Sequence, residues 1–84
     1  MTHETEIEGY SLQELANKIG DLGYDALQDL LSKIALKVQN DASKDRSRGR
    51  IKLAKQLEEA SKNLANAAKN IERTWIICEP HTLK

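Results

Sequence analysis

Apolar residues recur at helical spacing over most of the chain and predict three helices separated by short polar segments. The first predicted helix covers residues 11–20. It begins with a capping-box sequence, Ser11 followed by Glu14, in which side chains satisfy two orphan backbone donors. Gly20 and Gly23 bracket its end, because glycine tolerates the left-handed conformation that closes many helices.

The second helix is predicted over residues 25–40, where the apolar stripe is wide enough for the interior of a bundle. That stripe consists of Ala26, Leu27, Leu30, Leu31, Ile34, Ala35 and Val38. The apolar pattern lapses over residues 39–50, with Asn40 and Gly49 as candidate helix breakers. Because the only proline is Pro80, one unbroken helix is the alternative. A hairpin is favoured, since a long solvated stretch inside one helix would bury nothing.

The third predicted helix covers residues 47–78 and carries a heptad seam that we interpret as an interface. The seam consists of Ala54, Leu57, Ser61, Leu64, Ala68, Ile71, Trp75 and Cys78. Three of the four residues in one row are small, which lets a neighbouring helix approach closely. At 1.5 Å per residue this helix is roughly 40 Å long, so the second helix covers only part of it. The region around Trp75 is therefore expected to lack cover, and a second chain is the simplest way to supply it.

Together these elements predict an all-α fold, a helical hairpin with a short extra N-terminal helix. Residues 1–10 are expected to form a flexible acidic leader, residues 11–79 a single helical domain, and residues 80–84 a flexible tail. A chain of 84 residues has a thin margin of stability, and with one cysteine, Cys78, it cannot form an internal disulfide. Oligomerisation is the expected remedy, and a dimer is the expected form.

The overall charge and the chain's start limit the possible classes of partner. Thirteen basic and thirteen acidic residues give a net charge of zero, which argues against a dedicated nucleic-acid binder. The N-terminus has no basic region followed by an apolar run, so no signal peptide is predicted. No apolar stretch is long enough to cross a bilayer. We therefore expect a cytoplasmic protein without a membrane partner.

One segment nevertheless concentrates positive charge and is a candidate anion or nucleic-acid contact. It consists of Lys44, Arg46, Arg48, Arg50, Lys52 and Lys55. Clustered basic side chains bind phosphates by releasing counterions. The neighbouring acids and the missing aromatic residues for base stacking instead favour a solvated loop and helix start. Such a patch is also suited to an acidic protein surface, including the Glu4, Glu6 and Glu8 leader of a partner chain.

Residues 12–27 resemble a helix-turn-helix, over about a quarter of the chain. Leu15-Ala16, Ile19 and Gly20 fall where that motif places its packing residues and its turn. The match ends after Gly20. The second helix would present Tyr24, Asp25, Gln28 and Asp29 to the groove, and acidic residues there repel phosphates.

Catalytic chemistry has no support in the sequence. The two histidines, His3 and His81, lie near the termini, and there is no glycine-rich phosphate loop and no nucleophile beside a base. Cys78 and His81 have a Cys-x-x-His spacing, and two chains would supply four zinc ligands. Because Pro80 divides that group and no second ligand pair exists within the chain, we predict no metal, no other cofactor and no enzyme.

The sequence thus favours a helical protein-interaction module, an adaptor, small regulator or assembly subunit that self-associates through the seam from Ala54 to Cys78. The alternative is a small nucleic-acid-binding regulator that uses residues 44–55. Trp75 is either an interface anchor or a cap on the bundle core. The pattern leaves open whether the partner is a second copy or another helical protein, and whether a dimer is parallel or antiparallel.

Overall fold

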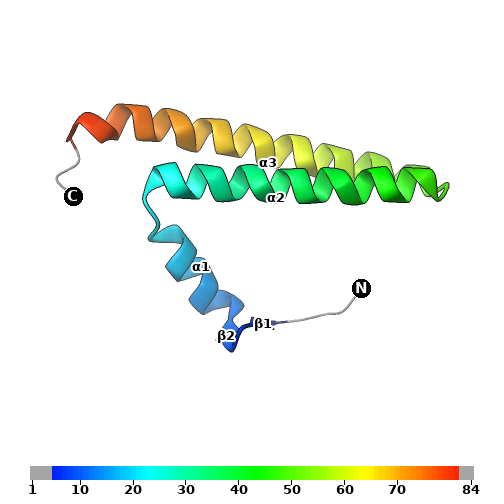
Figure 1. The fold of residues 1–84 in the computed structure, drawn as a ribbon, viewed down its shortest axis with the longest axis horizontal. Helices are drawn as coiled ribbons and strands as arrows, with labels where there is room; N and C mark the ends of the chain where they lie inside the picture. The colour runs from blue at the N-terminus through cyan, green and yellow to red at the C-terminus, as the bar shows by residue number, and fades with distance from the viewer. Residues whose placement is uncertain (1–4, 82–84) are drawn as a thin grey trace.

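The computed structural model describes residues 5–81 and confirms the all-α hairpin with a short N-terminal helix. The order of elements is β1 (Glu6–Ile7), β2 (Tyr10–Ser11), α1 (Leu12–Gly20), α2 (Tyr24–Ser47), α3 (Ile51–Cys78) and the 3₁₀ turn η1 (Glu79–His81). The two long helices, α2 and α3, run antiparallel side by side, and α1 points away from them (Figure 1).

The described part of the predicted leader is a small antiparallel β-hairpin. Ile7 pairs with Tyr10, and the intervening Glu8 and Gly9 have φ angles of 54° and 81°. Two positive φ angles in succession are the signature of the type I′ turn, whose twist matches that of the strands. The backbone N–H of Leu12 donates to the carbonyl of Thr5 at 3.1 Å. Glu4 and the residues before it lie outside the described part of the chain.

The capping box predicted for α1 is present. The Glu14 N–H donates to the Ser11 Oγ at 3.1 Å, and the Ser11 N–H donates to the Glu14 Oε1, also at 3.1 Å. The Lys18 ammonium lies 5.2 Å from the centre of the Tyr10 ring, a cation–π contact that ties the β-hairpin to the helix. The capping sequence therefore places the helix start correctly.

Helix α2 ends at Ser47, seven residues beyond the predicted end near Asn40. The polar segment stays helical because Ala42 is fully buried in the hairpin, so this segment does bury a contact. An ion pair four residues apart, Lys37 to Asp41 at 2.7 Å, supports the same stretch. Residues 48–50 form the turn, and α3 begins at Ile51 rather than at residue 47.

Gly49 allows this short turn because its φ angle is +81°, a left-handed conformation that side chains disfavour. We expect Gly49→Ala to destabilise the fold by about 1 kcal/mol through backbone strain alone, since no atom lies within 4 Å of the added Cβ. Gly20→Ala is the matched control, because Gly20 is equally open and helical. Urea unfolding followed by circular dichroism measures both variants, and equal losses would contradict this account.

The molecule is flat and open. Its extents are 51 × 30 × 12 Å, and a view down the shortest axis shows α2 and α3 side by side with α1 projecting away from them (Figure 1). The radius of gyration is 15.6 Å, whereas a compact domain of this length would have about 12 Å. Domains normally enclose a core between at least two layers. A single layer of helices leaves its broad faces uncovered.

The buried interior contains only small side chains. Within residues 5–81 the buried set is Ala35, Ala42, Ala54, Ser61 and Ala68, and no large side chain is fully buried. The leucines and isoleucines of these residues, which normally supply the core of a helical bundle, are all at least partly exposed. Among the described helices, none combines the length and apolar character needed to cross a membrane. The chain alone is an incomplete bundle.

Candidate interaction surface

The small-residue row of the predicted seam lies inside the hairpin. Ala54, Ser61 and Ala68 recur every seven residues along α3, opposite Ala35 and Ala42 of α2, and all five are buried. The Ser61 Oγ donates to the Ala35 carbonyl at 2.8 Å. Because a serine side chain is short, this bond requires the two backbones to approach closely. These three seam residues therefore contact α2 of the same chain.

The second row of the seam is only half-buried. Leu57, Leu64 and Ile71 follow the buried residues of α3 by three positions and so lie on one flank of that row. In α2, Leu31 and Val38 bear the same relation to Gln28 and Ala35. When two helices run antiparallel, turning by the same angle in the same sense, from the buried row of each helix and viewed along its own chain direction, leads to the same side of the pair. Both helices thus direct large apolar residues to one side of the hairpin.

We call this surface the apolar face. It comprises Leu27, Leu31, Ile34 and Val38 of α2, and Leu53, Leu57, Leu64 and Ile71 of α3. Ile34 is 39% exposed and Leu53 is 46% exposed, and the other six are half-buried. The opposite flank carries mainly polar residues, including Ser32, Gln39, Glu58 and Lys62. The hairpin therefore has one apolar and one polar face, although the contact between its two helices fully buries only alanine and serine.

The last seam residues lie on a part of α3 that extends past the first residue of α2 (Figure 1). Trp75 and Cys78 are half-buried, whereas Ile76 and Ile77 are 62% and 73% exposed. The indole of Trp75 is thus neither enclosed in a core nor fully in water. A hydrophobic helix end of this kind is suited to contact with another surface.

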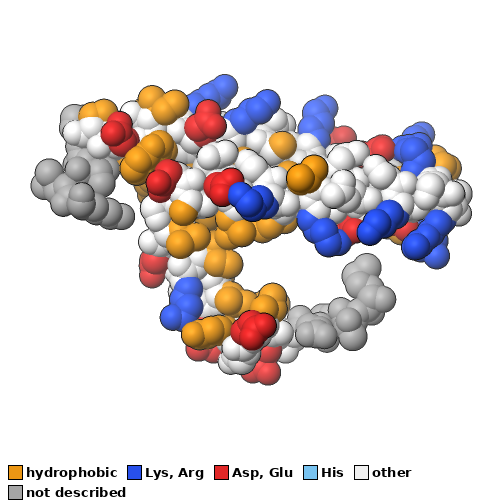
Figure 2. All heavy atoms as spheres, in the orientation of Figure 1, with side chains coloured by type: hydrophobic (Ala, Val, Ile, Leu, Met, Phe, Trp, Pro, Cys, Tyr) orange, Lys and Arg blue, Asp and Glu red, His pale blue; other side chains and the backbone are white. Residues whose placement is uncertain are grey.

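Helix α1 and the β-hairpin add further uncovered apolar side chains. Ile7 and Leu12 are 55% and 51% exposed, and Ile19 and Leu22 are also exposed. Figure 2 shows hydrophobic side chains along α1 and along the neighbouring edge of α2, with an open notch between them. This arrangement departs from a helix-turn-helix, in which the first helix packs against the second.

The six candidate basic residues gather at the hairpin turn, the right-hand end in Figure 2, but two are engaged within the chain. Arg46 donates to both carboxylate oxygens of Glu58, at 2.7 and 3.2 Å. Arg50 donates to Asp45 at 3.2 Å. The first pair joins α2 to α3, and the second joins α2 to the turn. Ion pairs at the surface each contribute on the order of 0.5 kcal/mol. The structure gives no ion pair for Lys44, Arg48, Lys52 or Lys55 within residues 5–81.

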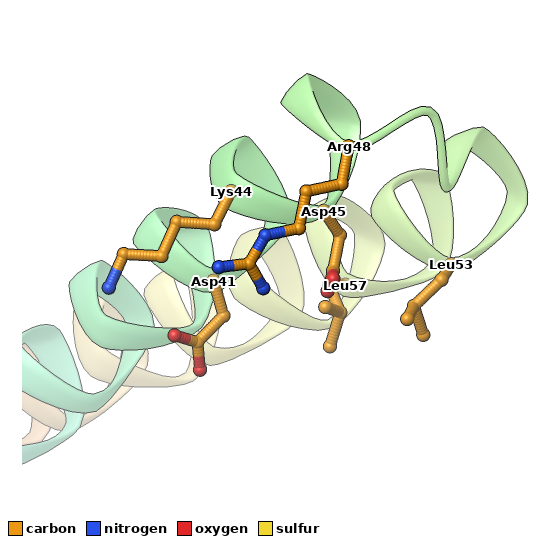
Figure 3. Close-up of a pocket in the computed structure, with 6 residues that line it drawn as sticks. All are labelled: Asp41, Lys44, Asp45, Arg48, Leu53 and Leu57. Atoms are coloured by element: carbon orange, nitrogen blue, oxygen red, sulfur yellow. The ribbon is translucent and has the colours of Figure 1, made fainter.

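A surface pocket of about 210 Å³ lies beside this turn, at one end of the apolar face (Figure 3). Leu53 and Leu57 form its apolar wall. The remaining lining residues are charged: Asp41, Lys44, Asp45 and Arg48. Because two carboxylates stand among the bases, the pocket is poorly suited to an anion. Its apolar wall and mixed charged rim are better suited to a hydrophobic side chain of a protein partner.

Asp41 provides a test of the electrostatics at this end. Lys37 donates to both of its carboxylate oxygens at 2.7 Å. This hydrogen bond, helped by the charges of Lys37 and Lys44 and outweighing the desolvation that opposes it, holds the pKa of Asp41 below its ordinary value of 3.8. A carboxyl whose pKa is lowered by folding stabilises the fold above its unfolded pKa, and this contribution is lost as the pH falls through the folded value.

We therefore expect an NMR titration of the Asp41 carboxyl to give a pKa below 3.8. In Lys37→Met the hydrogen bond is gone, so the pKa should rise toward that ordinary value. Lys33→Met is the matched control, because Lys33 forms the same kind of ion pair with Asp29 one turn earlier. A pKa of Asp41 that did not respond to Lys37→Met would contradict the hydrogen-bond origin of the shift.

Within residues 5–81 no three histidine, cysteine or acidic side chains group together in a way that could hold a metal ion.

The sequence predicts an interface on α3 alone and does not identify Leu27, Leu31, Ile34 and Val38 of α2 as part of the same surface. The available signal was their position on one flank of the alanines of α2. No protein-family model, curated protein or solved structure matches this chain.

Proposed function

We propose that the chain is a non-enzymatic helical interaction module that self-associates, two hairpins pairing through their apolar faces into a four-helix bundle. The observation that carries the proposal is the absence of any fully buried large side chain within residues 5–81, while eight large apolar residues lie on one side of the hairpin. Burying a leucine or isoleucine contributes about 1.5–3 kcal/mol, so a second layer supplies the missing stability.

The exposed area is of the size that such pairing requires. The chain has an accessible surface of 6759 Å², whereas a compact monomer of 9.4 kDa would have about 5,000 Å². The excess, on the order of 1,700 Å², is comparable to what each chain of an obligate dimer buries, about 1,000–2,500 Å². A twofold axis lying in the plane between two apolar faces would bring them together and cover both at once.

Light scattering coupled to size exclusion, at low and high salt, tests this proposal. We expect a mass of twice 9.4 kDa that persists in high salt, because burial of leucine and isoleucine is not screened by ions. A monomer at every concentration would contradict self-association. It would direct attention to another helical protein as the partner of the apolar face.

The alternative function is nucleic-acid binding at the hairpin turn. It is favoured by one observation, that six of the eight charged residues within 41–55 are basic. Fluorescence anisotropy with a short RNA or DNA duplex tests it, with Lys52→Ala/Lys55→Ala as the variant. Binding that weakened with salt and with this variant would support the alternative, since phosphate contacts release counterions. Binding indifferent to salt would rule out this mechanism.

A further inference from the structure

The zero net charge of the chain conceals a strong separation of charge along the molecule. Residues 41–55, at the hairpin turn, contain six basic and two acidic residues, a net charge of +4. Residues 5–29, which form the β-hairpin, α1 and the start of α2, contain six acidic residues and one lysine, a net charge of −5. We call these the basic turn and the acidic arm. They lie toward opposite ends of α2 (Figure 1).

Two paired hairpins can be oriented in two ways, and the charges distinguish them. With the hairpins parallel, each basic turn lies beside the other basic turn, and the acidic starts of the two α2 helices, with Asp25 and Asp29, lie together at the other end. With the hairpins antiparallel, each basic turn lies beside the acidic arm of the other copy. Like charges held within about a Debye length, roughly 8 Å at physiological salt, repel, and opposite charges attract. Electrostatics therefore favours the antiparallel pair.

The pocket at the basic turn gives a second, independent argument. Its wall residue Leu53 lies eight positions from Ser61 at the centre of the hairpin. Leu27 lies eight positions from Ala35 on the opposite side of that centre, and Ile71 lies ten positions from Ser61. Antiparallel pairing about the contact between Ala35 and Ser61 thus places the partner copy's Leu27 and Ile71 over the pocket.

Parallel pairing would instead place each pocket against the same pocket of the other copy. The charged rim, which includes Asp41, Asp45 and Arg48, would then be desolvated against identical groups. Burying like charges against one another is costly, whereas the partner's leucine and isoleucine would pack on the wall formed by Leu53 and Leu57 and bring no like charge to the rim. The shape and chemistry of the pocket thus agree with the charge distribution.

We propose that the partner of the apolar face is a second copy in antiparallel orientation, with each basic turn beside the partner's acidic arm and each pocket filled by the partner's Leu27 and Ile71. This inference rests on the proposed self-association and adds its orientation. It also gives the basic turn and the acidic arm one shared role, which is to exclude the parallel arrangement.

Nitroxide labels at two neutral, exposed positions measure the orientation by pulsed electron paramagnetic resonance. In a Cys78→Ala background, Ser43→Cys labels the turn end and Asn70→Cys labels the opposite end, both away from the apolar face. Light scattering on each labelled protein first establishes whether it is a dimer. An antiparallel pair separates the two copies of the Ser43→Cys label by about 24 Å along the axis, at 1.5 Å per residue. It brings that label level with the Asn70→Cys label of the other copy.

Two distances are compared. The first joins a Ser43→Cys label on one copy to an Asn70→Cys label on the other, and the second joins the two Ser43→Cys labels of a dimer. We expect the first distance to be the shorter. The reverse order in a dimer would overturn the antiparallel orientation and leave self-association standing. A monomer in the light-scattering step, for labelled and unlabelled protein alike, would overturn both proposals. The orientation and the proposed function therefore fail in different ways.

Discussion

Leu64→Glu is expected to abolish self-association. Leu64 lies three residues after the buried Ser61, near the middle of the apolar face, and is half-buried in the single chain. In the proposed bundle both copies of the glutamate would face an apolar partner, and burying an unpaired carboxylate costs several kcal/mol. If the two glutamates together weaken the free energy of association by about 4 kcal/mol, the dimer Kd rises roughly a thousandfold. Light scattering at micromolar concentration should therefore detect a monomer.

The chain offers a matched control for this substitution. Leu36 follows the buried Ala35 by one position and lies on the opposite flank of α2, where it is 62% exposed. Leu36→Glu introduces the same charge into a helix of the same hairpin, so effects on helix stability and net charge are comparable. It should leave the dimer intact. A dimer that survived Leu64→Glu, or dissociated with Leu36→Glu, would mean that the apolar face is not the interface.

The second large effect concerns the packing of α2 on α3. Ala54→Leu is expected to destabilise the protein by about 2 kcal/mol, and to lower the Tm by about 10 °C, because Ala54 is fully buried in the close contact between the helices. The added atoms force the helices apart and weaken the hydrogen bond from Ser61 to Ala35, which depends on close approach. Thermal unfolding by circular dichroism, at one fixed protein concentration, measures the change.

Ala26→Leu provides the comparison, because Ala26 lies in α2 and its side chain is exposed. Leucine and alanine both favour helices, so this substitution should change the Tm by only a degree or two. Similar losses in the two variants would show that helix propensity, rather than the small-residue row, sets the response. A Tm unchanged by Ala54→Leu would contradict the close packing of the hairpin.

Local signals in the sequence predicted several features correctly. Ser11 and Glu14 placed the start of α1, because a capping box satisfies backbone donors within a few residues and needs no tertiary partner. The heptad spacing of α3 predicted a long helix with one row of small and one row of large residues. The hairpin was correctly favoured over a continuous helix, with Gly49 at its turn, although the reason given, that the polar stretch would bury nothing, was wrong because Ala42 is buried. Each inference depended only on residues close together in the chain.

The end of α2 and the use of the seam depended on contacts between segments. Residues 41–47 look too polar for a buried helix, yet one alanine, Ala42, suffices when α3 presents Ala54 to the same buried layer. Its partner lies twelve residues away in the sequence, so no local pattern reveals it. The ion pair between Arg46 and Glu58 spans the same interval and likewise arises only after the chain reverses.

The sequence by itself determined that this protein is helical, that α3 carries two distinct rows, and that charge is separated along the chain, because periodicity and composition are properties of neighbouring residues. Tertiary structure alone decided that α2 packs against the small-residue row of α3. It also decided that the leucine row joins Leu27, Leu31, Ile34 and Val38 in one apolar face. The physical reason is that two helices approach most closely where both carry small side chains, and this leaves the large side chains on the flank for another surface to cover.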